Sequence, residues 1–232
     1  MIRDILKLSL ADSLVELRNL YKPEEVKEEY LSNRAKNRAL TIRNLLPKQM
    51  DVSMYLDFGG ADGSISKEVG ELFWLAGERI LCADLTSWEN MHHEESRNAG
   101  VVFVPLESEK IPVASGVVDL CTALQVFHHL PNLEESLREL YRILSPGGYL
   151  FVREHDSLSV QHREQFDMVH YLYEIVTAKV PNWEYMKHKA DYRSAEEWIQ
   201  LLSTVGFQLV AYEKARDQDI NRVCHLVFQK GV

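Results

Sequence analysis

The sequence is poor in cysteine and lacks any long apolar run. Its three cysteines, Cys82, Cys121 and Cys224, each lie within a short apolar segment. Three thiols cannot all pair, and their spacing is not that of metal ligands. We therefore expect buried free thiols in a reducing, cytoplasmic compartment, and no metal site. No apolar stretch is long enough to span a bilayer, and charges run through residues 1–21, unlike a secretory signal, so we expect no membrane insertion.

Positive charge is also scarce. The chain has 26 Lys and Arg against 35 Asp and Glu, a net charge of −9 in 232 residues. Phosphates are held largely by Lys and Arg, so this balance disfavours non-specific binding to nucleic acid. It leaves open a local basic groove or a basic partner subunit. The apolar content of 46% is typical of a globular protein, and the length allows one domain with a sizeable core.

What the sequence does contain is an alternation of apolar runs and amphipathic segments. Residues 1–46 have apolar positions three and four apart and predict helices, the second starting near Pro23. Strands are expected at 53–58, 79–84, 101–106, 117–124 and 149–154, with helices at 64–75 and 132–144. Continuous apolar strands separated by helices predict a mostly parallel sheet with helices on both faces.

The C-terminal part closes with a helix and two further strands. Ser194 and Glu197 have the spacing of a capping box at the start of helix 194–206. Apolar runs at 207–215 and 222–230, joined by a short polar stretch, predict an antiparallel hairpin. Added to the five earlier strands, the hairpin gives a seven-stranded sheet in an α/β fold.

A glycine-rich turn follows the first strand in the stretch YLDFGGADGS, residues 55–64. In an open parallel sheet this turn is the default ligand site. Its glycines miss the G-x-G-x-x-G register, and Asp57 ahead of them suits an amino-bearing ligand better than a pyrophosphate. Asp84 ends the next strand, 21 residues after Gly63, where an acid can accept hydrogen bonds from ribose hydroxyls. The alternative is a turn or helix-capping aspartate.

A longer ordered set of motifs carries a family resemblance. It comprises Glu107 before Ile111-Pro112, Val118-Asp119, His128-His129-Leu130, Arg142 to Gly148, and Gly206-Phe207. With the glycine turn, this set resembles class I S-adenosylmethionine (SAM)-dependent methyltransferases of the type 11 group, over about residues 50–153 and 194–230. The resemblance implies a Rossmann-like fold, SAM as cofactor and S-adenosylhomocysteine as product. The glycine register and the terminal hairpin disfavour a nicotinamide oxidoreductase.

The resemblance also implies a set of cofactor-binding residues. They are Asp57, Gly59, Gly60, Gly63, Asp84, Leu85, Glu107, Leu124 and Gln125. The turn would wrap the methionine part of SAM, with Asp57 near its amino group. Asp84 would bind the ribose, and Glu107 would face the adenine amino group.

Apolar and strand-end residues complete that implied site. Leu85 or Leu106 would pack on the adenine ring, and Leu124 and Gln125 would lie beside the methionine and the methyl group. Ala61 stands where many family members have glycine, which is a departure within the loop.

Candidate catalytic residues follow the fourth and fifth strands. They are His155, Glu154 and His128, the first two within the polar quartet Arg153-Glu154-His155-Asp156. A histidine beside a carboxylate can serve as a base, which methyl transfer needs only if the acceptor must lose a proton. The quartet can equally be an ordered salt-bridge network. At least one of His128 and His129 is expected to be structural, because the pair recurs in relatives with unlike substrates.

Three segments are assigned to domains and caps. We expect residues 1–47 to form an N-terminal helical lid, in which Tyr21, Tyr30 and Arg34 close over SAM, although Arg34 can equally be a solvated surface residue. Residues 48–232 form the SAM-binding domain, and 155–193 form an inserted cap over the acceptor. Aromatic residues in the cap suit stacking on a planar acceptor: Tyr171, Tyr173, Trp183, Tyr185 and Tyr192. Tyr171 can equally belong to the core face of a helix.

The acceptor itself stays open at this stage. We expect a small molecule. As an alternative, VREHDS, FDMVHYLYEIV and YRSAEEW resemble segments of mRNA-cap methyltransferases from viruses with large genomes, which implies a cap guanine or a nucleotide ribose. A methyltransferase-like partner subunit without catalysis is a third hypothesis. The joint presence of Asp57, Gly59, Asp84 and Glu107 speaks against it.

Overall fold

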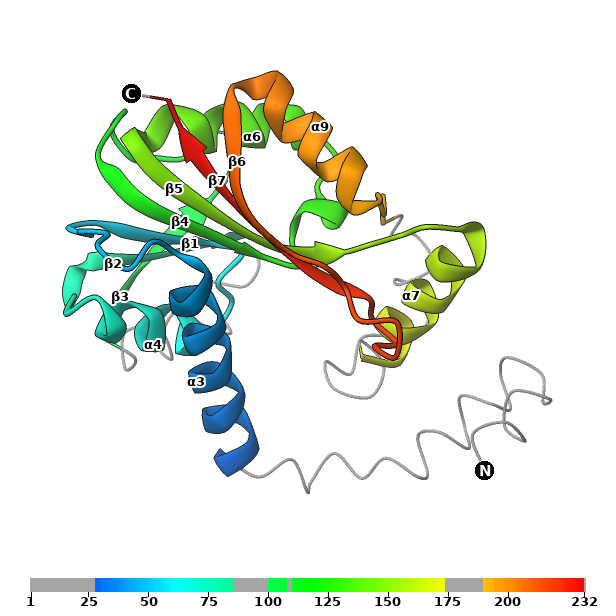
Figure 1. The fold of residues 1–232 in the computed structure, drawn as a ribbon. Coiled ribbons are helices and arrows are strands. Elements are labelled where there is room, and N and C mark those ends of the chain that lie inside the picture. The colour runs from blue at the N-terminus through cyan, green and yellow to red at the C-terminus, as the bar shows by residue number, and fades with distance from the viewer. Residues whose placement is uncertain (1–27, 86–99, 108–109, 174–189, 232) are drawn as a thin grey trace.

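The computed structural model describes residues 28–85, 100–107, 110–173 and 190–231 (Figure 1). A seven-stranded sheet has the order β3-β2-β1-β4-β5-β7-β6. Its strands are β1 (Tyr55–Phe58), β2 (Gly77–Leu85), β3 (Val101–Leu106), β4 (Val118–Leu124), β5 (Leu144–His155), β6 (Phe207–Glu213) and β7 (Val223–Lys230). The first five are parallel, and β7 is antiparallel to both neighbours. The predicted mostly parallel α/β sheet with a C-terminal hairpin is confirmed.

Helices cover both faces of this sheet (Figure 1). The helices are α3 (Glu28–Leu45), α4 (Ser64–Leu72), α6 (Leu133–Ile143), α7 (Val160–Tyr173) and α9 (Ala195–Val205), with a short 3-10 helix η2 (Phe127–His129). Figure 1 shows α6 and α9 on one face and α3 and α4 on the other. Helix α7 lies beyond the end of β5, at the carboxyl edge of the parallel strands.

Alternation along β1 explains the two layers of core. Tyr55 packs in one apolar cluster with Ile42 of α3 and Val69 of α4. Leu56, the next residue, packs in the other cluster with Trp198 of α9. Successive side chains of a strand point to opposite faces, so a fully buried strand such as β1 serves both layers.

The predicted signals at helix ends are present. Ser194 accepts a hydrogen bond from the Glu197 backbone N–H, and the Glu197 side chain accepts one from the Ser194 N–H. Gly206 ends α9 in the left-handed region with φ 111°, a conformation that favours glycine. Helix α3 ends at Leu45, two residues before Pro47; Pro23 lies outside the described residues.

One boundary differs from the sequence expectation. The Ser145–Gly148 stretch was expected to separate helix and strand, but β5 starts at Leu144 and runs through it. The pairing with β4 shifts register between Val118 and Leu120, so the stretch is absorbed as an irregularity inside the strand pair. Gly147, with φ 76°, permits that distortion.

Two expectations about the whole chain can be compared with the described residues. Cys82, Cys121 and Cys224 are buried free thiols, as predicted. Within the described ranges, none of the helices combines the length and the apolar character needed to cross a bilayer.

Candidate active site

The glycine turn between β1 and α4 is held close to its neighbours. The Gly59 N–H donates to the Ala83 carbonyl at 2.7 Å, which ties the turn to β2. Gly59 has φ 76°, and a Cβ there would stand 2.7 Å from Val126 Cγ2. A Cβ at Gly60 would stand 2.7 Å from Cys82 Sγ. Glycine is therefore required at both positions by close packing, and at Gly59 also by conformation.

Asp57 lies under the turn with both carboxylate oxygens engaged. Thr122 Oγ1 donates to Oδ1 at 2.6 Å, and Ser66 Oγ donates to Oδ2 at 2.7 Å. The Tyr55 hydroxyl is 2.7 Å from Thr122 Oγ1 and extends the chain. Burial raises the pKa of Asp57 to about 6, with Asp84 adding to the rise. Asp57 thus holds β1, β4 and α4 together beneath the turn, and its contact with the SAM amino group stays a prediction.

Asp84 lies at the carboxyl end of β2, as its strand-end position predicts. Its Oδ2 accepts the Ala61 N–H at 2.7 Å, and its Oδ1 accepts the Leu85 N–H at 2.7 Å. Each carboxylate oxygen has a second lone pair, so the group can still accept from a ligand. Asp84 thus fixes the backbone of Ala61, the residue that departs from the family pattern.

The ends of β2 and β3 carry the residues predicted to bind adenine. Leu85 pairs with Leu106 across β2 and β3. Leu85 is 52% exposed, which leaves an apolar surface beside Asp84. Glu107 follows Leu106 directly and is exposed. The sheet therefore brings Asp84, Leu85, Leu106 and Glu107 to one edge.

Gln125 connects the end of β4 to β5. It has φ 58°, a left-handed conformation that is uncommon for residues other than glycine and is often found at functional sites. Its backbone N–H donates to the Arg153 carbonyl at 2.7 Å. Arg153 Nη1 donates to the side-chain oxygen of Gln125. The side-chain nitrogen of Gln125 is then the donor to His155 Nε2 at 2.9 Å. Gln125 is thereby fixed between Arg153 and His155.

His155 is fully buried and has both ring nitrogens engaged. Nδ1 is 2.6 Å from the Asn221 carbonyl, which can only accept, so Nδ1 carries the proton. Burial lowers the pKa of His155 to about 4, and His128 acts in the same direction. His155 is therefore neutral near pH 7 and positions the amide of Gln125.

Glu154 is buried against η2. Its Oε1 accepts the Phe127 N–H at 2.8 Å, and its Oε2 lies 2.6 Å from His128 Nδ1. Burial raises the pKa of Glu154, while His155 opposes the rise. The ring of Tyr192 stacks on His128 with centroids 5.2 Å apart. The predicted catalytic residues His155, Glu154 and His128 are thus neighbours in space.

The other two members of the polar quartet have different roles. Asp156 forms a buried ion pair with Arg222 Nη2 at 3.1 Å and accepts the Ala195 N–H at 3.0 Å. It joins β5 to the hairpin and to α9, which is the salt-bridge alternative. Arg153 is only 6% exposed, and its Nε has no hydrogen-bond partner among the described residues. Burial lowers its pKa to about 9, and Arg38 of α3 adds to this lowering.

Sequence reasoning did not identify several partners in the site. Thr122 pairs with Asp57 in the register of β1 and β4, and its polar side chain within a buried strand was the available signal. His170 contacts the pair of His128 and His129 from α7, 42 residues after His128 in sequence. Within the proposed cap, Trp183 and Tyr185 lie outside the described residues, as do the side chains of Tyr171 and Tyr173. Tyr21 also lies outside them, and nothing is described of the Tyr30 side chain.

Comparison with known proteins identifies the family. A family model described as a methyltransferase domain matches residues 29–212. Among curated proteins, a ubiquinone/menaquinone biosynthesis C-methyltransferase of Klebsiella pneumoniae (strain 342) is 25% identical over 169 residues, covering 68% of this chain and 67% of that protein. The protein of the same name from Vibrio vulnificus (strain YJ016) is 24% identical over 68% of this chain and 65% of its own length. The chain thus spans about two thirds of these relatives.

Solved structures share the fold at low sequence identity. A SAM-dependent methyltransferase of Thermotoga maritima, described as a possible histamine N-methyltransferase, has TM-score 0.59 and 19% identity over 90% of this chain and 97% of its own. Human N-acetylserotonin methyltransferase in complex with SAM has TM-score 0.59 and 16% identity over 88% and 55%. A Haloferax volcanii protein solved with the Trm112 methyltransferase activator has TM-score 0.60 and 14% identity over 87% and 94%.

Proposed function

Since the chain belongs to the methyltransferase-domain family and is a SAM-dependent methyltransferase, we propose that it methylates a small molecule bound over the carboxyl ends of β4 and β5. One observation carries this proposal. Gln125 is held between Arg153 and His155. The next residue, Val126, packs so closely against Gly59 that a Cβ on Gly59 would lie 2.7 Å from Val126 Cγ2. The buried polar cluster therefore adjoins the glycine turn directly, so a methyl donor held by the turn would point into it.

The placement of SAM follows the predicted residues. Asp84 would accept hydrogen bonds from the ribose, with Leu85 and Leu106 against the adenine and Glu107 at its amino group. The glycine turn would follow the methionine part, with Leu124 and Gln125 beside the methyl group. The spacing of these residues along neighbouring strand ends supports an extended cofactor across β1, β2 and β4.

Arg153 supports an anionic group near the methyl group. It is a buried cation with its Nε unpartnered in the described structure, and Arg38 and Arg34 of α3 both lower its pKa. Glu154 and Asp219 offset part of this effect, and a buried cation favours a negative charge beside it. The methionine carboxylate of SAM or an acidic acceptor would supply it. Arg34 thus stays a predicted contributor to carboxylate binding.

Catalysis by this arrangement would be mainly positioning. Methyl transfer is an in-line displacement, and rigid placement of the two reactants supplies much of the rate enhancement. His155 holds Gln125, and Glu154 holds His128 at 2.6 Å. A proton-accepting role for these side chains stays a prediction that depends on whether the acceptor carries an acidic proton.

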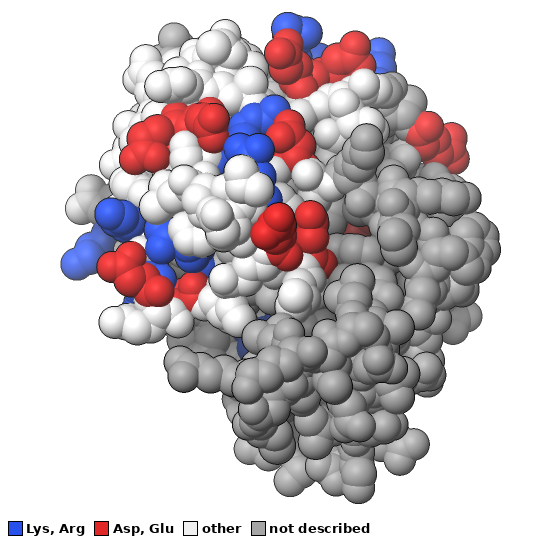
Figure 2. All heavy atoms as spheres, turned by 90° about the vertical axis from the view of Figure 1, so that its right-hand side faces the viewer, with Lys and Arg blue, Asp and Glu red and all other residues white. Residues whose placement is uncertain are grey.

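Capped RNA and a partner subunit remain the alternatives. Figure 2 shows acidic and basic side chains interspersed over the described part of one face. The mixed signs there, with the net charge of −9, do not favour a polyanion as the acceptor. The small-molecule proposal is therefore preferred, and capped RNA serves as the comparison in the assay.

Calorimetric titration with SAM and with S-adenosylhomocysteine tests the cofactor part of the proposal. We expect saturable binding of both by the purified chain. Phenols, amines, organic acids and capped RNA would then be screened side by side for methyl transfer. Transfer to capped RNA alone would contradict the small-molecule acceptor. Failure of the folded chain to bind SAM would instead favour the partner-subunit hypothesis.

A further inference from the structure

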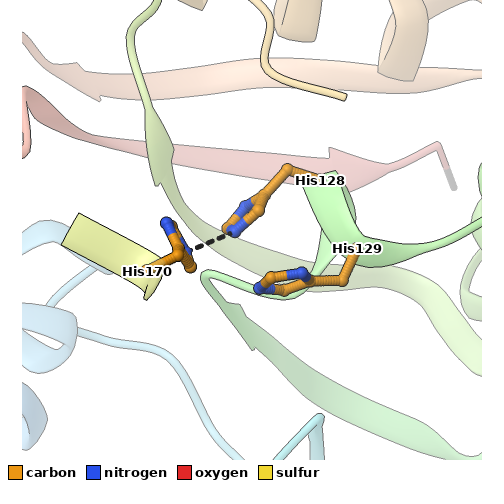
Figure 3. A group of neighbouring side chains, drawn as sticks. All are labelled: His128, His129 and His170. Carbon is orange, nitrogen blue, oxygen red and sulfur yellow. Dashed lines mark hydrogen bonds between the residues drawn. The ribbon is translucent and has the colours of Figure 1, made fainter. Parts of the chain in front are cut away.

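Three histidine side chains meet beside the candidate active site. His128 and His129 come from η2 and His170 from α7 (Figure 3). One nitrogen of each lies within 4.8 Å of the others. His128 is buried, whereas His129 and His170 are half-buried.

Hydrogen bonds on the far side of two rings fix which nitrogen faces the cluster. His170 Nδ1 lies 2.8 Å from the Phe166 carbonyl oxygen, which can only accept, so Nδ1 carries the proton, and the Tyr192 hydroxyl at 3.1 Å is a second acceptor for it. His128 Nδ1 lies 2.6 Å from Glu154 Oε2. Glu154 also accepts the Phe127 and His155 N–H groups, so an ionised Glu154 takes the Nδ1 proton of His128 as a third hydrogen bond. Both rings therefore donate through Nδ1 and turn Nε2 inward.

The two inward Nε2 atoms lie 3.1 Å apart (Figure 3). These two atoms form a hydrogen bond, so a proton can lie between them, and a metal ion can take the place of that proton. Nitrogen ligands about 2.0–2.1 Å from a tetrahedral metal are roughly 3.4 Å from one another. The observed separation is within a few tenths of an ångström of that value, and both protonated Nδ1 atoms have the outer partners that metal-bound histidines need.

We propose that His128, His129 and His170 bind one divalent cation of the zinc type. Imidazole nitrogens suit this class of metal, and three histidines with one open position are a recurrent zinc arrangement. His129 would complete the set by turning its half-buried ring inward. Glu154 and the Phe166 carbonyl would orient the two other ligands. This site departs from the sequence expectation of no metal.

The site would have a role in the reaction that rests on the proposed function. A fourth position on the ion would take an oxygen of a hydroxyl- or enol-bearing acceptor and lower its pKa. The acceptor proton would pass to solvent. A bond from the acceptor to the methyl carbon would then form as the carbon–sulfur bond of SAM breaks, leaving neutral S-adenosylhomocysteine. Metal binding itself needs neither SAM nor acceptor.

Zinc titration of the untagged, metal-stripped full chain tests the site. We expect a stoichiometry of about one and proton release on binding. His129→Ala and His170→Ala should each weaken zinc binding at least tenfold. His162→Ala is the matched control, because His162 lies two turns earlier on α7 and outside the cluster, and it should bind zinc like the natural chain. Equal zinc binding by all three variants, or absence of a site at this stoichiometry, would overturn the proposal.

Two further measurements separate the possible failures. Glu154→Gln should weaken zinc binding about 10- to 100-fold without changing the stoichiometry, as expected for an outer partner of a ligand; unchanged affinity would contradict the assigned orientation. Cobalt(II) should give the visible absorption of a tetrahedral complex, lost in His170→Ala. SAM affinity is measured on the zinc-free chain. If the natural chain binds zinc but not SAM, the proposed function is contradicted and the metal site stands. If it binds SAM but not zinc, the metal site is contradicted and the proposed function stands.

Discussion

Replacing Asp84 by alanine should sharply weaken SAM binding. The carboxylate ends β2 and already accepts the Ala61 and Leu85 N–H groups, which orients its remaining lone pairs outward from the strand end. Two hydrogen bonds from ribose hydroxyls to a charged acceptor contribute about 1.5–3 kcal/mol each. Their joint loss of about 3–6 kcal/mol corresponds to a roughly 100- to 20,000-fold increase in the dissociation constant.

The assay is calorimetric titration of both chains with SAM and with S-adenosylhomocysteine. Asp62→Ala is the matched control, because Asp62 lies in the same turn and, among the described residues, its carboxylate accepts hydrogen bonds from Ser64 alone. We expect it to retain most of the affinity. Asp84→Asn should be intermediate, since its amide oxygen can still accept the Ala61 N–H. If Asp84→Ala binds SAM as tightly as the natural chain, the ribose assignment is wrong.

Three other predictions follow from the same geometry. Because burial raises the pKa of Asp57 from 3.8 to about 6, the folded chain holds this proton more tightly than the unfolded chain. The free energy of unfolding should therefore fall by roughly 3 kcal/mol between about pH 4 and pH 6; urea unfolding of Asp57→Asn should lack that part of the fall, and an unchanged pH profile would count against the shift. His155→Ala should lower turnover at least tenfold while changing SAM affinity less, since the Gln125 amide loses its acceptor; equal turnover would return His155 to a structural role. Gly59→Ala should weaken SAM binding at least tenfold. Gly77→Ala is the control, because Gly77 also has a positive φ but a Cβ there would have nothing within 4 Å, and it should bind SAM like the natural chain. Equal SAM affinities of the two variants would show that close packing of Val126 on Gly59 does not matter for SAM binding.

The parts of the fold that sequence could predict are those set by local pattern. Apolar runs predicted all seven strands, because burial on both faces needs continuous apolar sequence. Ser194 and Glu197 predicted the start of α9, because a capping box is contained within four residues. The Ser145–Gly148 stretch misled, because residues that break a helix can also sit within an irregular strand pair.

The candidate site was only partly predictable, because its contacts join distant segments. Asp84 could be identified from its place at a strand end. The internal partners of Asp57 could not, since Thr122 faces it only in the register of β1 with β4. His170 reaches His128 from α7, and no local spacing signals that contact. The left-handed backbone of Gln125 also has no signature in its neighbours.

The strand order has a consequence for how the protein is made. His155 pairs with Val223 of β7, and its ring donates to the Asn221 carbonyl. Asp156 likewise depends on Arg222. Chains leave the ribosome N-terminal end first, so β1 to β5 emerge well before these partners. A nascent chain stalled before residue 221 would carry the strands of the cofactor turn but lack the partners that order the acceptor side. The strands that carry the predicted methyl-donor residues are thus made early in synthesis, and the partners of the predicted acceptor side are made later.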